Sequence, residues 1–95
     1  MKFYKNRAAR YHPALQISES DKTWKNMVMT HKPNNKQRFI KLKKNPNRSD
    51  PGDAYIEKYV RTNPIRTRGD ILKRFNLSDE DLAQIEKYLE GKRKS

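Results

Sequence analysis

The sequence predicts a mainly β domain of the α+β class: a small, strongly curved antiparallel barrel or sheet with one C-terminal α-helix. Two observations favour this class. Short runs of alternating apolar and polar residues follow one another with turn-forming residues between them, as at Pro13–Glu19 and Arg38–Lys44. Helical periodicity is confined to the end of the chain, from Ser78 onward. Because 95 residues with 33% apolar content supply only a small core, we expect a single domain over residues 1–95.

The first half of the chain is expected to hold three strands. Residues 1–12 are basic and aromatic with little periodicity, and no strand is predicted there. Pro13–Glu19 alternates as a half-buried strand does, and Trp24–Thr30 contains three consecutive apolar residues that suit a strand buried on both faces. In Arg38–Lys44, Ile40 and Leu42 alternate with Phe39, Lys41 and Lys43. The two lysines are therefore expected on the opposite face, toward solvent or a ligand.

The second half is expected to add one or two strands and the helix. Residues 45–53 contain two prolines and a glycine and are predicted to form a loop. Residues 54–61 predict a strand with Ile56 and Val60 on one face and Tyr55, Glu57, Tyr59 and Arg61 on the other, stopped by residues 62–64. Residues 70–75 fit a short strand or a helical turn. Ser78 is placed as the N-cap of a helix that ends at Gly91.

Positive charge is concentrated in the first half of the chain. Residues 1–48 contain thirteen lysines and arginines against two acids, a formal +11 of the total +12. Basic residues neutralise phosphates and release condensed counterions, so such asymmetry favours a polyanionic ligand, RNA or DNA. Solubility alone requires charge but not asymmetry. An acidic protein partner remains an alternative.

Several classes of chemistry are not supported by any motif. The chain has no cysteine, so it has no disulfide or thiolate metal site. No phosphate-binding loop, dinucleotide fingerprint or metal-spaced cluster is present, and no metal or cofactor is expected. No apolar run approaches a membrane span and no secretory signal is recognised, so a cytoplasmic protein without a membrane partner is expected.

The remaining candidates suit phosphodiester chemistry or simple binding. Histidine exchanges protons near neutral pH, which makes His12 a candidate acid or base, with Thr30 as a hydrogen-bond donor and Arg61 as a group that stabilises negative charge. The candidate nucleic-acid contacts are Arg10, Lys32, Lys41, Lys43, Thr62, Arg66 and Arg68. Four aromatic residues are suited to stacking on bases: Tyr4, Tyr11, Trp24 and Phe39. Of these, Trp24 and Phe39 are expected in the core, because the chain has few large apolar residues.

Four segments together resemble one protein family. Residues 12–18, His-Pro-Ala-Leu-Gln-Ile-Ser, resemble the Arg-Pro-x-Leu-Val-Ile segment of the MazF/PemK toxins, and Met27–Thr30 resembles the following strand. Residues 54–62, which close in Val-Arg-Thr, resemble the strand before that family's Arg-Thr turn, and residues 77–89 resemble its closing helix. The order and rough spacing agree over residues 10–90.

The resemblance implies a fold and an activity. Members are SH3-like β-barrels with a C-terminal helix, usually homodimeric, and most cut single-stranded RNA unless a cognate antitoxin restrains them. The ribose 2′-hydroxyl attacks the adjacent phosphate without metal or cofactor. By resemblance, His12 and Thr30 would lie at the active site, supported by Arg61 and Thr62.

The chain also departs from the family pattern. His12 stands where arginine is common, and an Arg-x-Asp pair used by some members falls on Ile56 and Lys58. The family's first strand and Gly-Asp turn are not evident. Three hypotheses therefore stay open: an RNA-directed ribonuclease, a non-catalytic nucleic-acid-binding module, and an interaction domain for an acidic partner such as an antitoxin.

Overall fold

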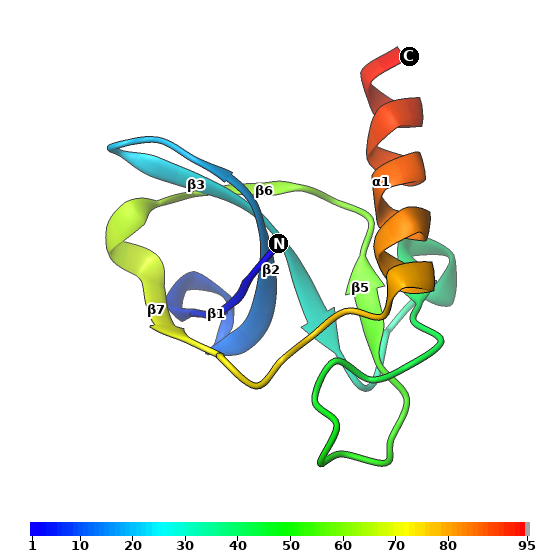
Figure 1. Cartoon of the computed structure of the whole chain (residues 1–95). Helices are drawn as coiled ribbons and strands as arrows, with labels where there is room; N and C mark the ends of the chain where they lie inside the picture. Colours follow the sequence, from blue (N-terminus) through cyan, green and yellow to red (C-terminus); the bar gives the residue numbers. More distant parts are fainter. Residues whose placement is uncertain (95) are drawn as a thin grey trace.

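The computed structural model describes residues 1–94, with side chains through Lys92, and consists of a curved antiparallel sheet and one C-terminal helix (Figure 1). The strands are β1 (Phe3–Asn6), β2 (His12–Glu19), β3 (Thr23–Thr30), β4 (Phe39–Lys41), β5 (Tyr55–Glu57), β6 (Arg61–Pro64) and β7 (Arg68–Ile71). Three 3₁₀ turns, η1 (Arg7–Ala9), η2 (Lys36–Arg38) and η3 (Ile65–Thr67), join them, and α1 spans Asp79–Lys94. The predictions of a mainly β chain, antiparallel pairing and a C-terminal helix are confirmed.

Strand β3 is the centre of the sheet. The strand order is β4-β5-β3-β2-β1-β7, and β6 pairs with β3 outside this path. One edge of β3 has two successive partners: its first half pairs with β6, where Asn26 lies opposite Arg61, and its end pairs with β5, where Met29 lies opposite Ile56. The chain must therefore leave the sheet between β5 and β6 and return to the same strand.

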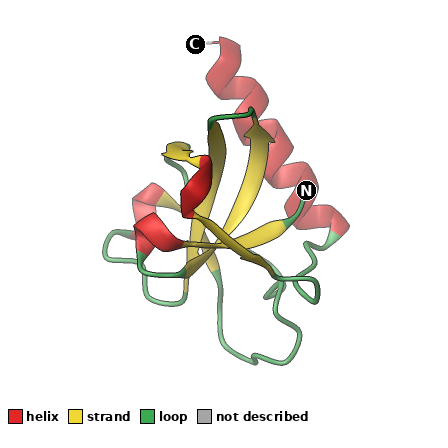
Figure 2. Cartoon of the chain, turned by 90° about the vertical axis from the view of Figure 1, so that its left-hand side faces the viewer, coloured by secondary structure: helices red, strands yellow, loops and turns green. Residues whose placement is uncertain are grey.

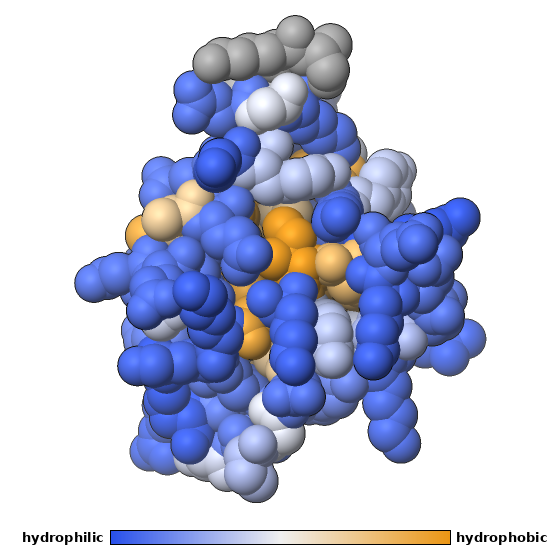
Figure 3. Space-filling model, turned by 90° about the vertical axis from the view of Figure 1, so that its right-hand side faces the viewer, coloured by the Kyte–Doolittle hydropathy of each residue, from blue (hydrophilic) through white to orange (hydrophobic). Residues whose placement is uncertain are grey.

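The two faces of the sheet are packed differently. One face carries the main core, which includes Phe3, Leu15, Met27 and Ile56, and α1 contributes the fully buried Ile85. Figure 2 shows the molecule from the side away from α1, and in this view the helix lies behind the sheet. A smaller apolar cluster is built around the buried Trp24. The surface on the α1 side of the molecule is mostly hydrophilic, with a small apolar patch near its middle (Figure 3).

Three asparagines join strands that are distant in sequence. The Asn6 side-chain amide donates to Asn26 Oδ1 at 2.8 Å and to Asn63 Oδ1 at 3.1 Å, and Asn26 Nδ2 donates to Asn63 Oδ1 at 3.0 Å. Asn6 and Asn26 are fully buried. Buried amides are costly unless they are paired. This asparagine triad therefore fixes the positions of β1, β3 and β6 relative to one another.

The start of α1 is attached to the sheet through an acid. Ser78 Oγ accepts from the Asp81 amide at 3.2 Å, which confirms the predicted N-cap. The buried Asp81 carboxylate accepts from the backbone N–H groups of Lys43 and Lys44 at 2.8 and 3.1 Å. Further along the helix, the Tyr88 hydroxyl donates to the Lys58 carbonyl at 3.0 Å. These bonds connect α1 to the segments that follow β4 and β5.

Some element predictions are wrong. Strand β1 lies in the segment for which no strand is predicted, and it pairs with both β2 and β7. The single strand predicted over residues 54–61 is two strands, and residues 62–64 continue β6 instead of stopping it. Tyr55 is buried instead of facing outward. Gly91 does not end the helix, which continues to Lys94.

We expect Asn26→Ala to lower the free energy of unfolding by about 2–4 kcal/mol, because it removes a fully buried amide and with it one hydrogen bond to Asn6 and one to Asn63. Urea denaturation of the two proteins measures the difference. Asn34→Ala, at an exposed position, is the matched control. Equal losses in both variants would show that the triad is not a stabilising network.

Candidate nucleic-acid interface

An open groove of about 530 Å³ runs beside β3 and contains four cations. We call it the cationic groove. The charged and polar residues that line it are Arg10, His12, Thr30, Lys32, Asn34, Arg38, Glu57 and Arg61, and the apolar ones are Ala8, Ala9, Val28 and Phe39. The three residues predicted for chemistry, His12, Thr30 and Arg61, thus line one groove although 49 positions separate the first from the last.

The His12 ring is held in a defined orientation. Its Nδ1 lies 2.8 Å from the Ala9 carbonyl oxygen at the end of η1. A carbonyl only accepts, so Nδ1 carries the proton and donates. In the neutral ring, Nε2 is then the nitrogen with the free lone pair, and it is available to take a proton from a ligand.

Thr30 is half-buried at the end of β3. Its hydroxyl oxygen accepts from the Lys32 amide at 3.3 Å. A hydroxyl that accepts one hydrogen bond still has its own proton to donate. Thr30 can therefore donate to an anionic oxygen of a ligand in the groove.

Arg61 and Glu57 form an ion pair within the groove. Arg61 Nε donates to Glu57 Oε2 at 3.2 Å, and the Glu57 side chain is only 19% exposed. The two residues meet because the chain leaves the sheet after β5 and returns at β6. The carboxylate orients the guanidinium, whose terminal nitrogens remain suited to phosphate oxygens.

The backbone before His12 is in an uncommon conformation. Arg10 and Tyr11 have φ angles of 55° and 63°, in the left-handed region. Each costs about 1 kcal/mol for a residue other than glycine. The turn is held by the Tyr11 amide, which donates to the Asn6 carbonyl at 2.9 Å. It brings Arg10 to the groove immediately before His12.

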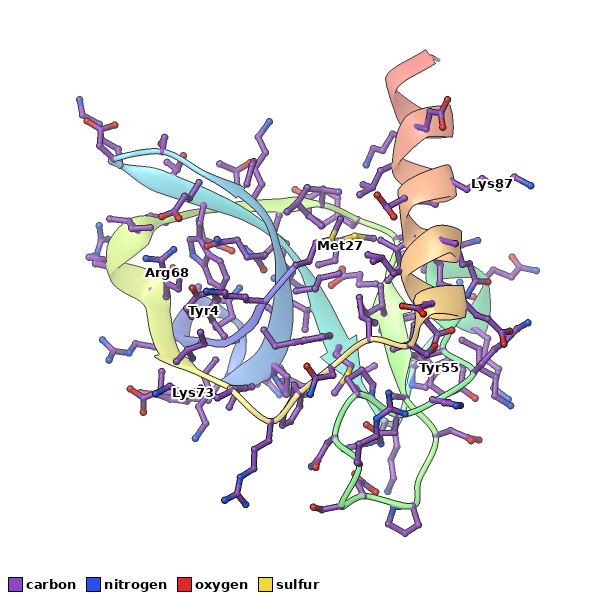
Figure 4. The ribbon with its side chains drawn as sticks, viewed as in Figure 1. Tyr4, Met27, Tyr55, Arg68, Lys73 and Lys87 are labelled. Carbon is purple, nitrogen blue, oxygen red and sulfur yellow. The ribbon has the colours of Figure 1, made fainter. Side chains whose placement is uncertain are left out.

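Five of the predicted nucleic-acid contacts do not line the cationic groove. Lys41 lies 3.8 Å from Asp53 and Lys43 donates to Glu80 at 2.7 Å, so these neighbouring lysines do not act together. Arg68 donates to Gln16 and Glu19 and stacks 4.7 Å above the Tyr4 ring (Figure 4). The remaining two, Thr62 and Arg66, are exposed on β6 and η3.

Several groove residues are absent from the predicted site, and three of them bear on its chemistry. Arg38 and Glu57 were not among the candidate contacts, although the alternation in residues 54–61 puts Glu57 on the same face as Arg61. Phe39 was expected in the core, and this is wrong: its side chain is half-buried and lines the groove. The expectation for Trp24 is confirmed, since it is fully buried and donates to Thr67 Oγ1 at 3.1 Å.

Comparison of the chain with family models, curated proteins and solved structures returns no match. Within the described residues, no three His, Asp or Glu side chains are grouped so that they could hold a metal ion. No helix in residues 1–94 is long and apolar enough to cross a membrane.

The Lys43–Glu80 pair predicts a pH-dependent contribution to stability. The hydrogen bond from Lys43 and then the positive charge of Lys43 lower the pKa of Glu80. The same hydrogen bond and then the negative charge of Glu80 raise the pKa of Lys43. A lowered carboxyl pKa stabilises the fold above the ordinary value of 4.5, and this contribution is lost as the pH falls through the lower value of the folded state. We therefore expect Glu80→Gln to be less stable than the unaltered protein at neutral pH, and the difference to vanish in acid.

Urea denaturation across this pH range measures the effect, with the exposed Glu86→Gln as the control on the same helix. A difference that persists unchanged in acid would contradict an origin in the Glu80 charge.

Proposed function

We propose that the chain binds single-stranded RNA in the cationic groove and cleaves it without a metal ion. The observation that carries this proposal is that His12, Thr30 and Arg61 line one groove together with further cations. In this reaction the ribose 2′-hydroxyl attacks the adjacent phosphate. The reaction is promoted by a group that accepts the hydroxyl proton and by groups, such as a hydroxyl and a guanidinium, that stabilise the developing negative charge.

The binding step would rest on the cations. Arg10, Lys32 and Arg38 are exposed, and no partner among the described residues occupies their charged groups. Their contacts with phosphates would release counterions and supply affinity without sequence preference. A flexible single strand can bring its 2′-oxygen in line with the scissile bond, as the reaction geometry demands.

The chemical step would use His12 as the base. His12 Nε2 takes the proton from the 2′-hydroxyl, whose oxygen forms a new bond to phosphorus. The bond from phosphorus to the 5′-oxygen breaks, and that oxygen takes a proton from a solvent water, whose hydroxide is neutralised by the proton held on His12. Arg61 and Thr30 stabilise the charge that develops on the non-bridging oxygens. The products are a 2′,3′-cyclic phosphate and a free 5′-hydroxyl, and Glu57 acts as a positioning residue for Arg61.

The resemblance to the MazF/PemK toxins supports the same proposal. The resemblance also extends the proposal to a closed SH3-like barrel, a homodimer, a cytoplasmic location and an antitoxin that restrains the activity. An acidic antitoxin segment would compete with RNA for the same cations. A chain without such a partner would be toxic on expression.

A non-catalytic RNA-binding module is the second candidate. It is favoured by the ion pair between Arg61 and Glu57, because the carboxylate offsets part of the charge that cleavage requires. Binding through the groove's other cations needs no proton transfer. The two functions share one ligand and differ only in its fate.

Cleavage is tested with a long single-stranded RNA in the presence of a metal chelator. We expect discrete fragments that end in 2′,3′-cyclic phosphate, and His12→Ala should slow their appearance at least about a hundredfold, the range typical for loss of a general base. Thr30→Ala and Arg61→Gln should slow it as well. Lys87→Gln, on a helix side chain that points away from the sheet (Figure 4), should cleave at the unaltered rate. RNA that is bound but stays intact would assign the binding module instead.

Binding is tested with a 2′-O-methyl oligonucleotide, which cannot cyclise. We expect affinity to fall steeply with salt, and Arg38→Gln should reduce the slope of log K against log salt by about 0.7, the value for one phosphate contact on a single strand. Lys87→Gln should leave the slope unchanged. A flat salt dependence for the unaltered protein would contradict phosphate binding.

A further inference from the structure

Phe39 differs from the other two phenylalanines in its surroundings. Phe3 is buried in the main core, and Phe75 packs on that core with its ring centroid 5.7 Å from that of Phe3. Phe39 belongs to neither apolar cluster of the described residues. It is half-buried and lines the cationic groove. Its ring therefore offers apolar surface to whatever occupies the groove.

The register of β4 and β5 explains this position. Ile40 lies opposite Ile56, and both side chains are in the core. Phe39 lies opposite Glu57, so these two side chains are neighbours on the other face of the sheet. Glu57 in turn holds Arg61, and the ring and the guanidinium that would contact the phosphate line the same groove.

The peptide unit that joins Arg38 to Phe39 is hydrogen-bonded through both of its polar groups. The Phe39 N–H donates to the carbonyl of Lys36, the first residue of η2. The carbonyl of the preceding residue, Arg38, accepts from the Lys58 amide at 2.8 Å. A side chain on a fixed backbone binds a ligand without the cost of ordering that backbone.

We propose that Phe39 forms a nucleobase subsite: an unpaired base stacks on its ring while the adjoining phosphate binds Arg61. This rests on the proposed function and adds the element that distinguishes single-stranded nucleic acid from other polyanions. Every base has a π-face, and stacking on an aromatic side chain contributes to binding whatever the base. A base within a duplex is already stacked and is not available. The groove therefore selects unpaired segments.

The test combines a protein variant with a change in the ligand. The probe is a 2′-O-methyl octanucleotide, together with versions in which each position in turn lacks its base. Phe39→Leu should weaken binding of the intact probe about tenfold. At one position, loss of the base should weaken binding to the unaltered protein by a similar factor and have little further effect on Phe39→Leu, which is the coupling expected of two groups in contact.

Two controls separate stacking from general damage. Phe39→Tyr keeps the ring and should bind as the unaltered protein does, and Phe75→Leu should lower stability without changing affinity. The salt slope of Phe39→Leu should equal that of the unaltered protein, because no phosphate contact is removed. A changed slope would show that the groove itself had been disturbed and would overturn the subsite.

Failure of the subsite is distinguishable from failure of the proposed function. If the unaltered protein binds the probe but no position shows coupling with Phe39, the nucleobase subsite is wrong and RNA binding stands. If the unaltered protein binds an acidic peptide and not the probe, both are wrong. Equal affinity for the single strand and for its duplex would overturn the subsite alone.

Discussion

The hydrogen bonds among Asn6, Asn26 and Asn63 determine where the groove residues lie. Asn26 is opposite Arg61 in the sheet, and Asn63 is on the same strand as Arg61, so the triad holds β6 against β3 at the groove. Asn6 reaches the other side of the site. Its Oδ1 accepts from the Ala8 amide and starts η1, which ends in the carbonyl that orients His12. One small network therefore positions both the imidazole and the guanidinium.

The concentration of positive charge in the first half of the chain does not by itself locate the candidate site. Ion pairs within the structure occupy Lys41, Lys43 and Arg68, although all three are predicted nucleic-acid contacts. Exposed pairs of this kind contribute little to stability, but they do redirect a side chain. The groove cations were therefore identified by which side chains share a surface, and net charge indicated only the class of ligand.

Local patterns predicted the elements whose residues have local reasons to adopt them. The alternation around Ile40 and Ile56 correctly predicted a core face, and Ser78 correctly predicted the start of α1. The alternation also put Glu57 and Arg61 on one face. It missed the interruption between them, which arises because the same edge of β3 accepts two partners.

Other features had no local signal. Strand β1 has four residues, and it is held by β2, β7 and the asparagine triad, of which β7, Asn26 and Asn63 are distant from it in sequence. An isolated asparagine in a sequence is usually read as a turn or surface residue, so the burial of Asn6 and Asn26 was not predictable from either position alone. The role of Phe39 likewise depends on the strand it lies beside.

The asparagine triad has a consequence for how the protein responds to its solution. Amide groups carry no net charge and do not titrate, so neither acidity nor dissolved ions act directly on the hydrogen bonds of the triad. The triad therefore does not respond directly to pH or salt, although both affect the ligand and the charged side chains that bind it. Changes in binding with acidity or ionic strength then have their origin in the ligand and in charged groups of the protein, and not in the triad itself.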